Sequence, residues 1–181
     1  MLKKVLLALV LVVAGIAVYA WTRPDTFTVE RSIRIDAPPQ RIYPLIADFR
    51  QWQRWSPWEK LDPAMERMHE GPSSGAGARY SWKGNDSVGS GQMTITAAAM
   101  PRRVDINLQF IEPMASSSKT RFDITPDGGG SAVRWTMTGD SPYFLKLMSV
   151  FANLDTMLGK DVETGLMQLK QAAESRVAPQ P

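Results

Sequence analysis

The feature that most constrains this chain is an uninterrupted apolar run close to its start. Lys3 and Lys4 are followed by about 17 residues, Val5 to Trp21, that carry no charge. As a helix rising ~1.5 Å per residue, this run reaches the lower limit for crossing a bilayer. A helix buried in a soluble domain normally keeps a polar face, and this run has none. We therefore expect residues 1–21 to be a transmembrane anchor or a signal segment.

Anchoring and cleavage need the same kind of start. Ala20 is a small residue at an acceptable cleavage position, whereas Tyr19 and Trp21 also suit the aromatic belt at a membrane surface. We predict an anchor, with secretion after signal cleavage as the alternative. Because positive residues favour the cytoplasmic side, Lys3 and Lys4 predict a single pass through the inner membrane and a domain in the periplasm.

The remaining ~160 residues suit one domain with its own core. The formal net charge is only +3, and after residue 21 Arg102 and Arg103 are the only adjacent pair among scattered basic residues, so nothing indicates nucleic-acid binding. The sequence has no cysteine and a single histidine, His69. This composition excludes disulfides, thiolate metal sites and histidine-rich zinc sites. We expect neither a metal nor a cofactor.

Hydrophobic periodicity divides the rest of the chain into elements. Alternating, β-prone residues predict a strand at 26–36, and Asp36 before two prolines predicts the start of a helix that runs to about Phe49. Turn residues separate six further strand-like runs, at 65–70, 78–84, 90–99, 102–111, 117–125 and 131–138. From Pro142 the apolar residues recur at three- and four-residue steps, which predicts one long amphipathic helix ending near Ser175.

This order of elements predicts an α+β fold. An antiparallel sheet must cover its apolar face, and the C-terminal helix is the one segment with enough apolar surface to do so. We expect a bent sheet wrapped around that helix, with a space between them.

Three stretches carry a resemblance to a known family. They are Val29 to Pro39 (VERSIRIDAPP), Trp55 to Trp58 (WSPW) and Gly159 to Leu166 (GKDVETGL). With the element order, they resemble the START/Bet v 1-like helix-grip (SRPBCC) superfamily, in particular its polyketide cyclase/dehydrase-like bacterial subgroup with an N-terminal membrane segment. The resemblance implies a hydrophobic cavity for a lipid-like or polycyclic ligand. It does not choose an activity, because carriers, cyclases and sensors share this fold.

The resemblance covers about 27–175, which we predict to be a helix-grip ligand-binding domain. Residues 22–26 are expected to be a linker, and 176–181 a disordered tail. The expected ligand is a small hydrophobic molecule. The residues expected to line the cavity or cover its mouth are Trp55, Trp58, Met93, Ile106, Leu108, Phe110, Trp135, Met137, Met148, Phe151 and Asp155.

Two of these expectations have competing interpretations. Trp55 and Trp58 suit a lid over the cavity mouth, but we favour a packed loop that holds a short second helix against the sheet. Trp135 is expected to point inwards and narrow the cavity, and with the methionines it would fill the cavity of a degenerate family member.

No catalytic residue is assigned. Cyclases of this fold use polar residues inside the cavity to transfer a proton. The candidates are Glu66, Asp105, Arg121, Asp155 and Asp161. Strand parity puts Asp105 and Arg121 on the solvent side, and His69 is expected at the surface. A cyclase or dehydratase, or a protein-interaction module using Trp52 to Trp58, therefore stay as alternatives to a binding protein.

Overall fold

The structure is a computed structural model that describes residues 2–151 and 154–175. The predicted tail at 176–181 and the side chain of Phe151 lie outside the described part. The elements, in chain order, are α1 (Leu2–Trp21), β1 (Thr26–Ile35), α2 (Pro39–Ala47), the 3₁₀ helices η1 (Phe49–Arg54) and η2 (Trp58–Lys60), β2 (Glu66–Glu70), β3 (Arg79–Lys83), β4 (Ser90–Ala99), β5 (Arg103–Glu112), β6 (Ser116–Asp127), β7 (Gly130–Asp140), α3 (Tyr143–Phe151) and α4 (Leu154–Glu174).

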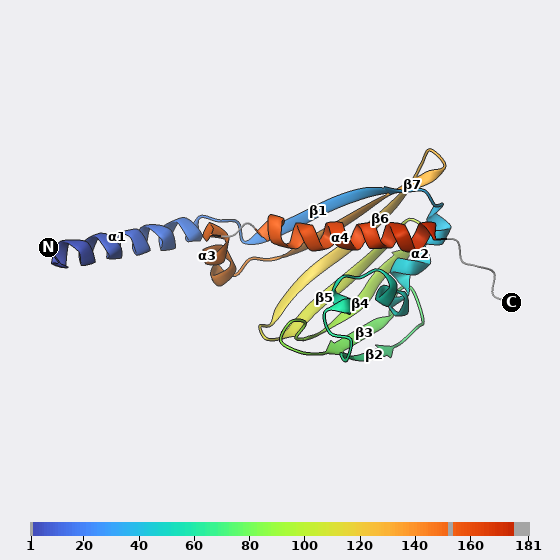
Figure 1. Ribbon diagram of the computed structural model, residues 1–181, viewed down its shortest axis with the longest axis horizontal. Coiled ribbons are helices and arrows are strands. Elements are labelled where there is room, and N and C mark those ends of the chain that lie inside the picture. Colours follow the sequence, from blue (N-terminus) through green and yellow to red (C-terminus); the bar gives the residue numbers. More distant parts are fainter. Residues whose placement is uncertain (1, 152–153, 176–181) are drawn as a thin grey trace.

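The strands form one antiparallel sheet in the order β1-β7-β6-β5-β4-β3-β2. The sheet is strongly curved, α4 runs along β1 on its inner side, and α2 lies beside the end of α4 (Figure 1). This arrangement confirms the predicted α+β helix-grip fold.

The predicted strands agree with the structure to within two residues at each end. The agreement follows from strict alternation, as in β7, where Val133, Trp135 and Met137 are buried and Arg134 is exposed. A strand with one buried face needs this period of two, so its register can be recognised from the sequence.

The single long helix predicted after Pro142 is wrong, because the structure has two helices in this segment. α3 contacts α1, whereas α4 contacts β1 and α2. One straight helix cannot reach both sets of partners. The two glycines in α4 also serve close packing: a Cβ at Gly159 would overlap the Arg31 guanidinium, and one at Gly165 would lie 2.8 Å from the Trp135 ring.

The expected Asp36 cap is also wrong. The residue that precedes α2 is Pro38, and no side chain caps that helix. Asp36 instead accepts a hydrogen bond from Arg34, and its backbone N–H donates to Glu174 Oε1 at 2.6 Å. The helix nevertheless begins at the predicted place, because prolines are tolerated in a first turn, where N–H groups have no helical partner.

α1 projects away from the domain and leaves almost all of its side chains exposed (Figure 1). Among the described residues it is the one helix long and apolar enough to cross a membrane, a criterion that signal sequences also meet.

Candidate functional site

The inner face of the sheet is filled with aromatic rings at one end, which we call the closed end. One row across the strands contains Val104, Phe122 and Trp135. The Phe122 and Trp135 ring centroids are 4.7 Å apart, and Trp55 contributes a third ring, 5.7 Å from Trp135. All of these side chains are buried. No ligand fits between such contacts unless the core opens.

Burial decreases along β5 towards the other end of the same face. The exposed fraction is 0% for Val104, 1% for Ile106, 9% for Leu108 and 38% for Phe110, although all four side chains point inwards. Two rows make up this open end of the inner face. Its larger side chains are Phe27, Trp82, Met93, Leu108 and Phe110.

The centre of the open end is built from small residues. In these two rows Ser118 and Gly139 follow Leu108, while Gly91 and Ser116 flank Phe110. The Phe27 ring comes within 2.6 Å of where a Cβ of Gly139 would be, and the Trp82 ring within 2.5 Å of one at Gly91. The Phe27 and Trp82 rings therefore lie directly against the glycine backbone of the sheet, and no side chain from these glycines rises into the space above it.

A hollow of about 600 Å³ lies on the opposite, outer face of the sheet. Its lining is mostly polar and charged, with Arg103, Asp105, Lys119 and Arg121 among the residues. Asp105 pairs with Arg103 at 2.7 Å and with Arg121 at 2.8 Å. This hollow does not suit a hydrophobic ligand, since a buried ligand would have to cover these charges.

The structure separates the expected lining residues into groups. Trp55, Ile106 and Trp135 belong to the packed core, so Trp55 is not a lid. Met93, Leu108 and Phe110 lie at the open end, and Met137 is in the row next to it.

Three further expectations need correction. Trp58 is half-buried against Trp135, with ring centroids 5.8 Å apart. Met148 is on α3 and exposed, away from the inner face. Asp155 does not face an apolar space, because it forms an ion pair with Arg31 at 2.9 Å.

Arg31 fastens the start of α4 to β1. Its guanidinium also pairs with Glu163 at 2.6 Å, and it passes so close over Gly159 that a Cβ there would require the guanidinium to shift. Its hydrogen bonds lower the pKa of Asp155 below the ordinary value. The start of α4 is thus held by ion pairs at its surface in addition to the packing of Leu158 and Val162 against the core.

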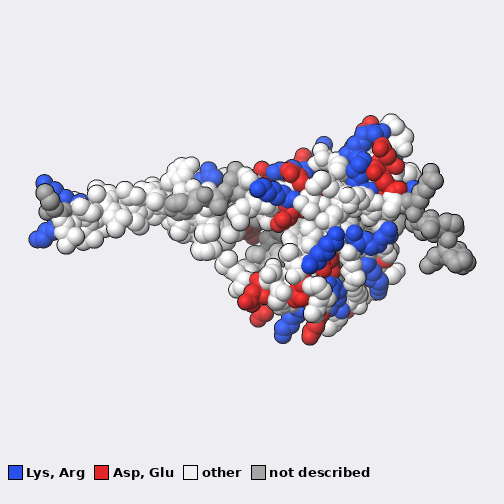
Figure 2. All heavy atoms as spheres, viewed as in Figure 1, with Lys and Arg blue, Asp and Glu red and all other residues white. Residues whose placement is uncertain are grey.

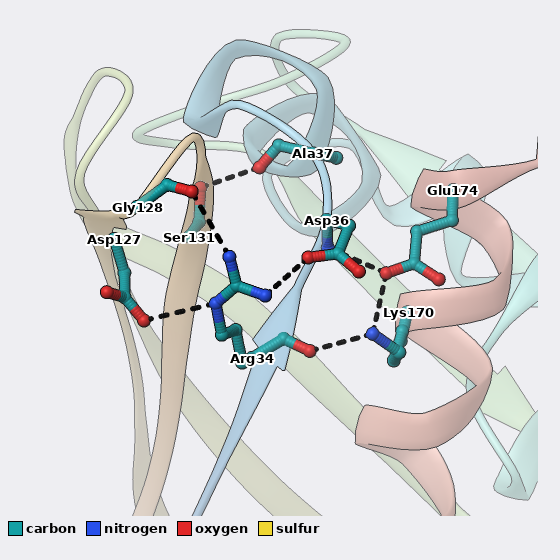
Figure 3. A network of polar contacts seen from close by, with 8 residues as sticks. All are labelled: Arg34, Asp36, Ala37, Asp127, Gly128, Ser131, Lys170 and Glu174. Carbon is teal, nitrogen blue, oxygen red and sulfur yellow. Dashed lines mark hydrogen bonds and ion pairs between the residues drawn. The ribbon is translucent and has the colours of Figure 1, made fainter.

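The other end of α4 is fixed beside the closed end by a polar network (Figure 3). Lys170 Nζ donates to the Arg34 carbonyl at 2.9 Å and to Glu174 at 2.7 Å. Arg34 also reaches Asp127 and the Gly128 carbonyl in the β6–β7 turn. The network connects β1, the β6–β7 turn and α4, so it stabilises the closed end.

A polar cluster that the sequence did not reveal lies under η2. Glu59 is buried and accepts from the Tyr80 hydroxyl at 2.5 Å and from Arg67 Nε at 2.8 Å. Burial, then the bond to Glu59, raises the pKa of Tyr80. Each charge has its partner, so this cluster ties η2 to β2 and β3. Arg67 and Tyr80 are 8 and 21 positions from Glu59 in the chain, and no local sequence motif connects the three residues.

His69 belongs to the edge of this cluster. Its ring centroid lies 5.0 Å from that of Tyr80, and burial followed by the Arg50 charge lowers its pKa. His69 is thus partly buried on the edge strand β2 instead of fully exposed, because the odd-numbered side chains of this strand face inwards. Glu66 and Asp161 are exposed, and Asp105 and Arg121 lie on the outer face as parity predicted.

Comparisons with known proteins agree with this geometry. A family model described as "Polyketide cyclase / dehydrase and lipid transport" matches residues 26–174. No curated protein matches the chain.

Several solved structures share the fold at low identity. Protein CV1439 from Chromobacterium violaceum is 15% identical with a TM-score of 0.59, over 85% of this chain and 100% of that one. The Aha1 dimer from Colwellia psychrerythraea is 18% identical with a TM-score of 0.55, over 84% and 99%. The di-domain aromatase/cyclase BexL of the BE-7585A biosynthetic pathway is 16% identical with a TM-score of 0.59, over 87% of this chain and 53% of that one. With a family match from β1 to the end of α4, the chain belongs to the polyketide cyclase/dehydrase and lipid transport family.

Proposed function

We propose that this chain is a membrane-tethered protein that binds a small hydrophobic or lipid-like ligand at the open end of the inner face. The description of its family includes lipid transport, and its fold is one that also occurs in BexL. The single observation that carries the proposal is the loss of burial along β5, from 0% at Val104 to 38% at Phe110.

An apolar face left incompletely covered favours an apolar guest. Each Å² of apolar surface that leaves water contributes about 25 cal/mol, so a lipid chain against Phe27, Trp82 and Phe110 would be held by burial alone. Trp82 and Phe110 meet edge to face, with ring centroids 5.6 Å apart. They offer a flat and an edge-on aromatic surface side by side.

The indole nitrogen of Trp135 is buried and has no hydrogen-bond partner among the described residues. A buried donor without a partner costs about 1–3 kcal/mol. This atom belongs to the closed end, two rows from Leu108, so a ligand at the open end would reach it only if the core opened.

The tether part of the proposal rests on α1. Its length and exposed apolar side chains suit a bilayer, and Lys3 and Lys4 favour a cytoplasmic start with the domain in the periplasm. A tethered domain meets membrane lipids at high local concentration.

Neither alternative has a specific observation in its favour. The row of Leu108 and Met93 continues into Tyr80 and His69, but the Tyr80 hydroxyl donates to the buried Glu59 and belongs to the polar cluster under η2. A cyclase needs such a group placed for proton transfer to the ligand. Trp52 and Trp55 are buried, so of the tryptophans in the segment Trp52 to Trp58 only the half-buried Trp58 is accessible to a protein partner.

Native mass spectrometry of the full chain, extracted from its source membrane in a mild detergent, tests ligand binding. We expect a co-purifying small molecule, or retention of added oleic acid or phosphatidylglycerol. Phe110→Asp places a charge at the open end and should reduce retention about tenfold or more. Met100→Asp is the matched control, because Met100 is an exposed apolar residue beyond the other end of β5.

Failure to retain any molecule in repeated preparations, or equal losses in the two variants, would refute the proposed site.

A further inference from the structure

The exposed surface of α3 is apolar. Phe144 is 53% exposed and Met148 48% exposed, and Tyr143 is exposed beside them. The sequence of this helix contains a single charged residue, Lys146. That side chain is almost fully buried and pairs with Asp25, whose carboxylate is 94% exposed. A helix surrounded by water rarely exposes its apolar side chains while its one charged side chain is buried.

The contact between α3 and α1 sets the level of α3 relative to the apolar helix. Tyr143 Oη donates to the Ala17 carbonyl at 3.0 Å, and its ring centroid is 6.1 Å from that of Trp21. Ala17 precedes Trp21 by four residues, which is about 6 Å along a helix axis. If α1 crosses a hydrocarbon core of ~30 Å, this contact lies at the headgroup boundary.

A second apolar element is at the same end of the domain. The turn between β5 and β6 points towards the side from which α1 extends (Figure 1). Met114 in this turn and Ile111 near the end of β5 are both more than half exposed, and Glu112, between them, is exposed as well. Figure 2 shows blue side chains at the N-terminal tip of α1 and little charge along the rest of that helix, whereas blue and red side chains are concentrated over the body of the domain.

We propose that α3 and the β5–β6 turn dock on the surface of the bilayer that α1 enters. The occupant of this apolar surface is the membrane itself, because the surface continues from α1 and carries no exposed charge on α3. Amphipathic segments of this kind sink about 5–10 Å into the headgroup region. The inference rests on the tether in the proposed function, and it specifies the source of the ligand. Phe110 lies near the end of β5, close to this turn, so the open end would face membrane lipids directly.

The absence of cysteine makes this proposal testable in the full chain. Single cysteines at Phe144, Met148 and Met114 would carry a nitroxide label in nanodiscs of phosphatidylcholine and phosphatidylglycerol. Electron paramagnetic resonance then compares the accessibility of each label to oxygen, which concentrates in lipid, and to a water-soluble nickel chelate. Leu9→Cys in α1 is the reference for the bilayer, and Met68→Cys, exposed on β2, is the reference for water.

We expect labels at Phe144 and Met114 to show an oxygen-to-nickel ratio between those at Leu9 and Met68, and several-fold above Met68. Values equal to Met68, with Leu9 in lipid, would overturn the docking while leaving the tether intact. Protection of Phe144 from both reagents would also overturn it, since that result indicates a protein contact such as a second copy. A water-exposed Leu9 would overturn the tether and the docking together. Ligand retention is measured separately with Phe110→Asp, so the two failures are distinguishable.

Discussion

The two ends of the inner face differ in what their rows contain, although the same strands build both. The closed end places Phe122 and Trp135 next to each other, and Trp55 completes a solid aromatic core. At the open end, the equivalent positions of β6 and β7 are Ser118 and Gly139. A change of side-chain size along two strands thus divides one face into a stabilising part and a part suited to a guest.

The two ends of α4 also differ in how they are attached to the rest of the domain. Near the closed end, its last turns join the network of Arg34, Lys170 and Glu174 and pack on the buried core. Its start is held by Arg31, through ion pairs with half-exposed carboxylates. Exposed ion pairs contribute little to stability. The start of α4 is therefore the end that opens at lower cost.

The largest expected effect compares two phenylalanines on the inner face. Phe122→Ala removes a fully buried ring and should lower the free energy of unfolding by about 3–5 kcal/mol. Phe110→Ala should cost only about 1 kcal/mol, because that ring is already 38% exposed. Urea denaturation of the full chain in a mild detergent, followed by tryptophan fluorescence, measures both. Equal costs would mean that the two ends are packed alike.

A smaller effect is expected from the two glycines of α4. Gly165→Ala should destabilise the protein by about 1–3 kcal/mol, despite the better helix propensity of alanine, because the new methyl group meets the buried Trp135 ring. Gly159→Ala meets only the end of the flexible Arg31 side chain, and we expect a change within about 0.5 kcal/mol. The same urea denaturation experiment measures both variants. A larger loss of stability for Gly159→Ala than for Gly165→Ala would mean that the start of α4 is packed more rigidly than its later turns.

The smallest effect concerns the ion pair at the start of α4. Because Arg31 lowers the pKa of Asp155 below its ordinary value of 3.8, the pair stabilises the folded state above that pH. This contribution is lost as the pH falls through the lowered pKa. We expect the Tm of Asp155→Asn to be slightly below that of the wild type near about pH 6 and to converge with it towards about pH 2.

Scanning calorimetry at several pH values checks this convergence, with Asp161→Asn, on the exposed side of the same helix, as the control. A difference that persisted unchanged in acid would show that Asp155 acts through something other than its charge.

The strands could be predicted from the sequence because each has a buried and an exposed face. Val104, Ile106 and Leu108 alternate with polar residues, and this pattern depends only on neighbours in the chain. The site was harder to predict. Parity identified Leu108 and Phe110 as inward-facing, but it could not distinguish them from Ile106, since burial along one face depends on what lies above it.

The sequence by itself determined the apolar helix, the strand pattern and the family, because these depend on composition and on spacing along the chain. Only the tertiary structure decided which inward-facing residues are packed and which are open. That difference arises from contacts between distant residues: Trp135 against Gly165, Phe27 against Gly139, and Glu59 against Tyr80. Such contacts depend on strand register and helix placement, which are set by the whole fold rather than by any local sequence.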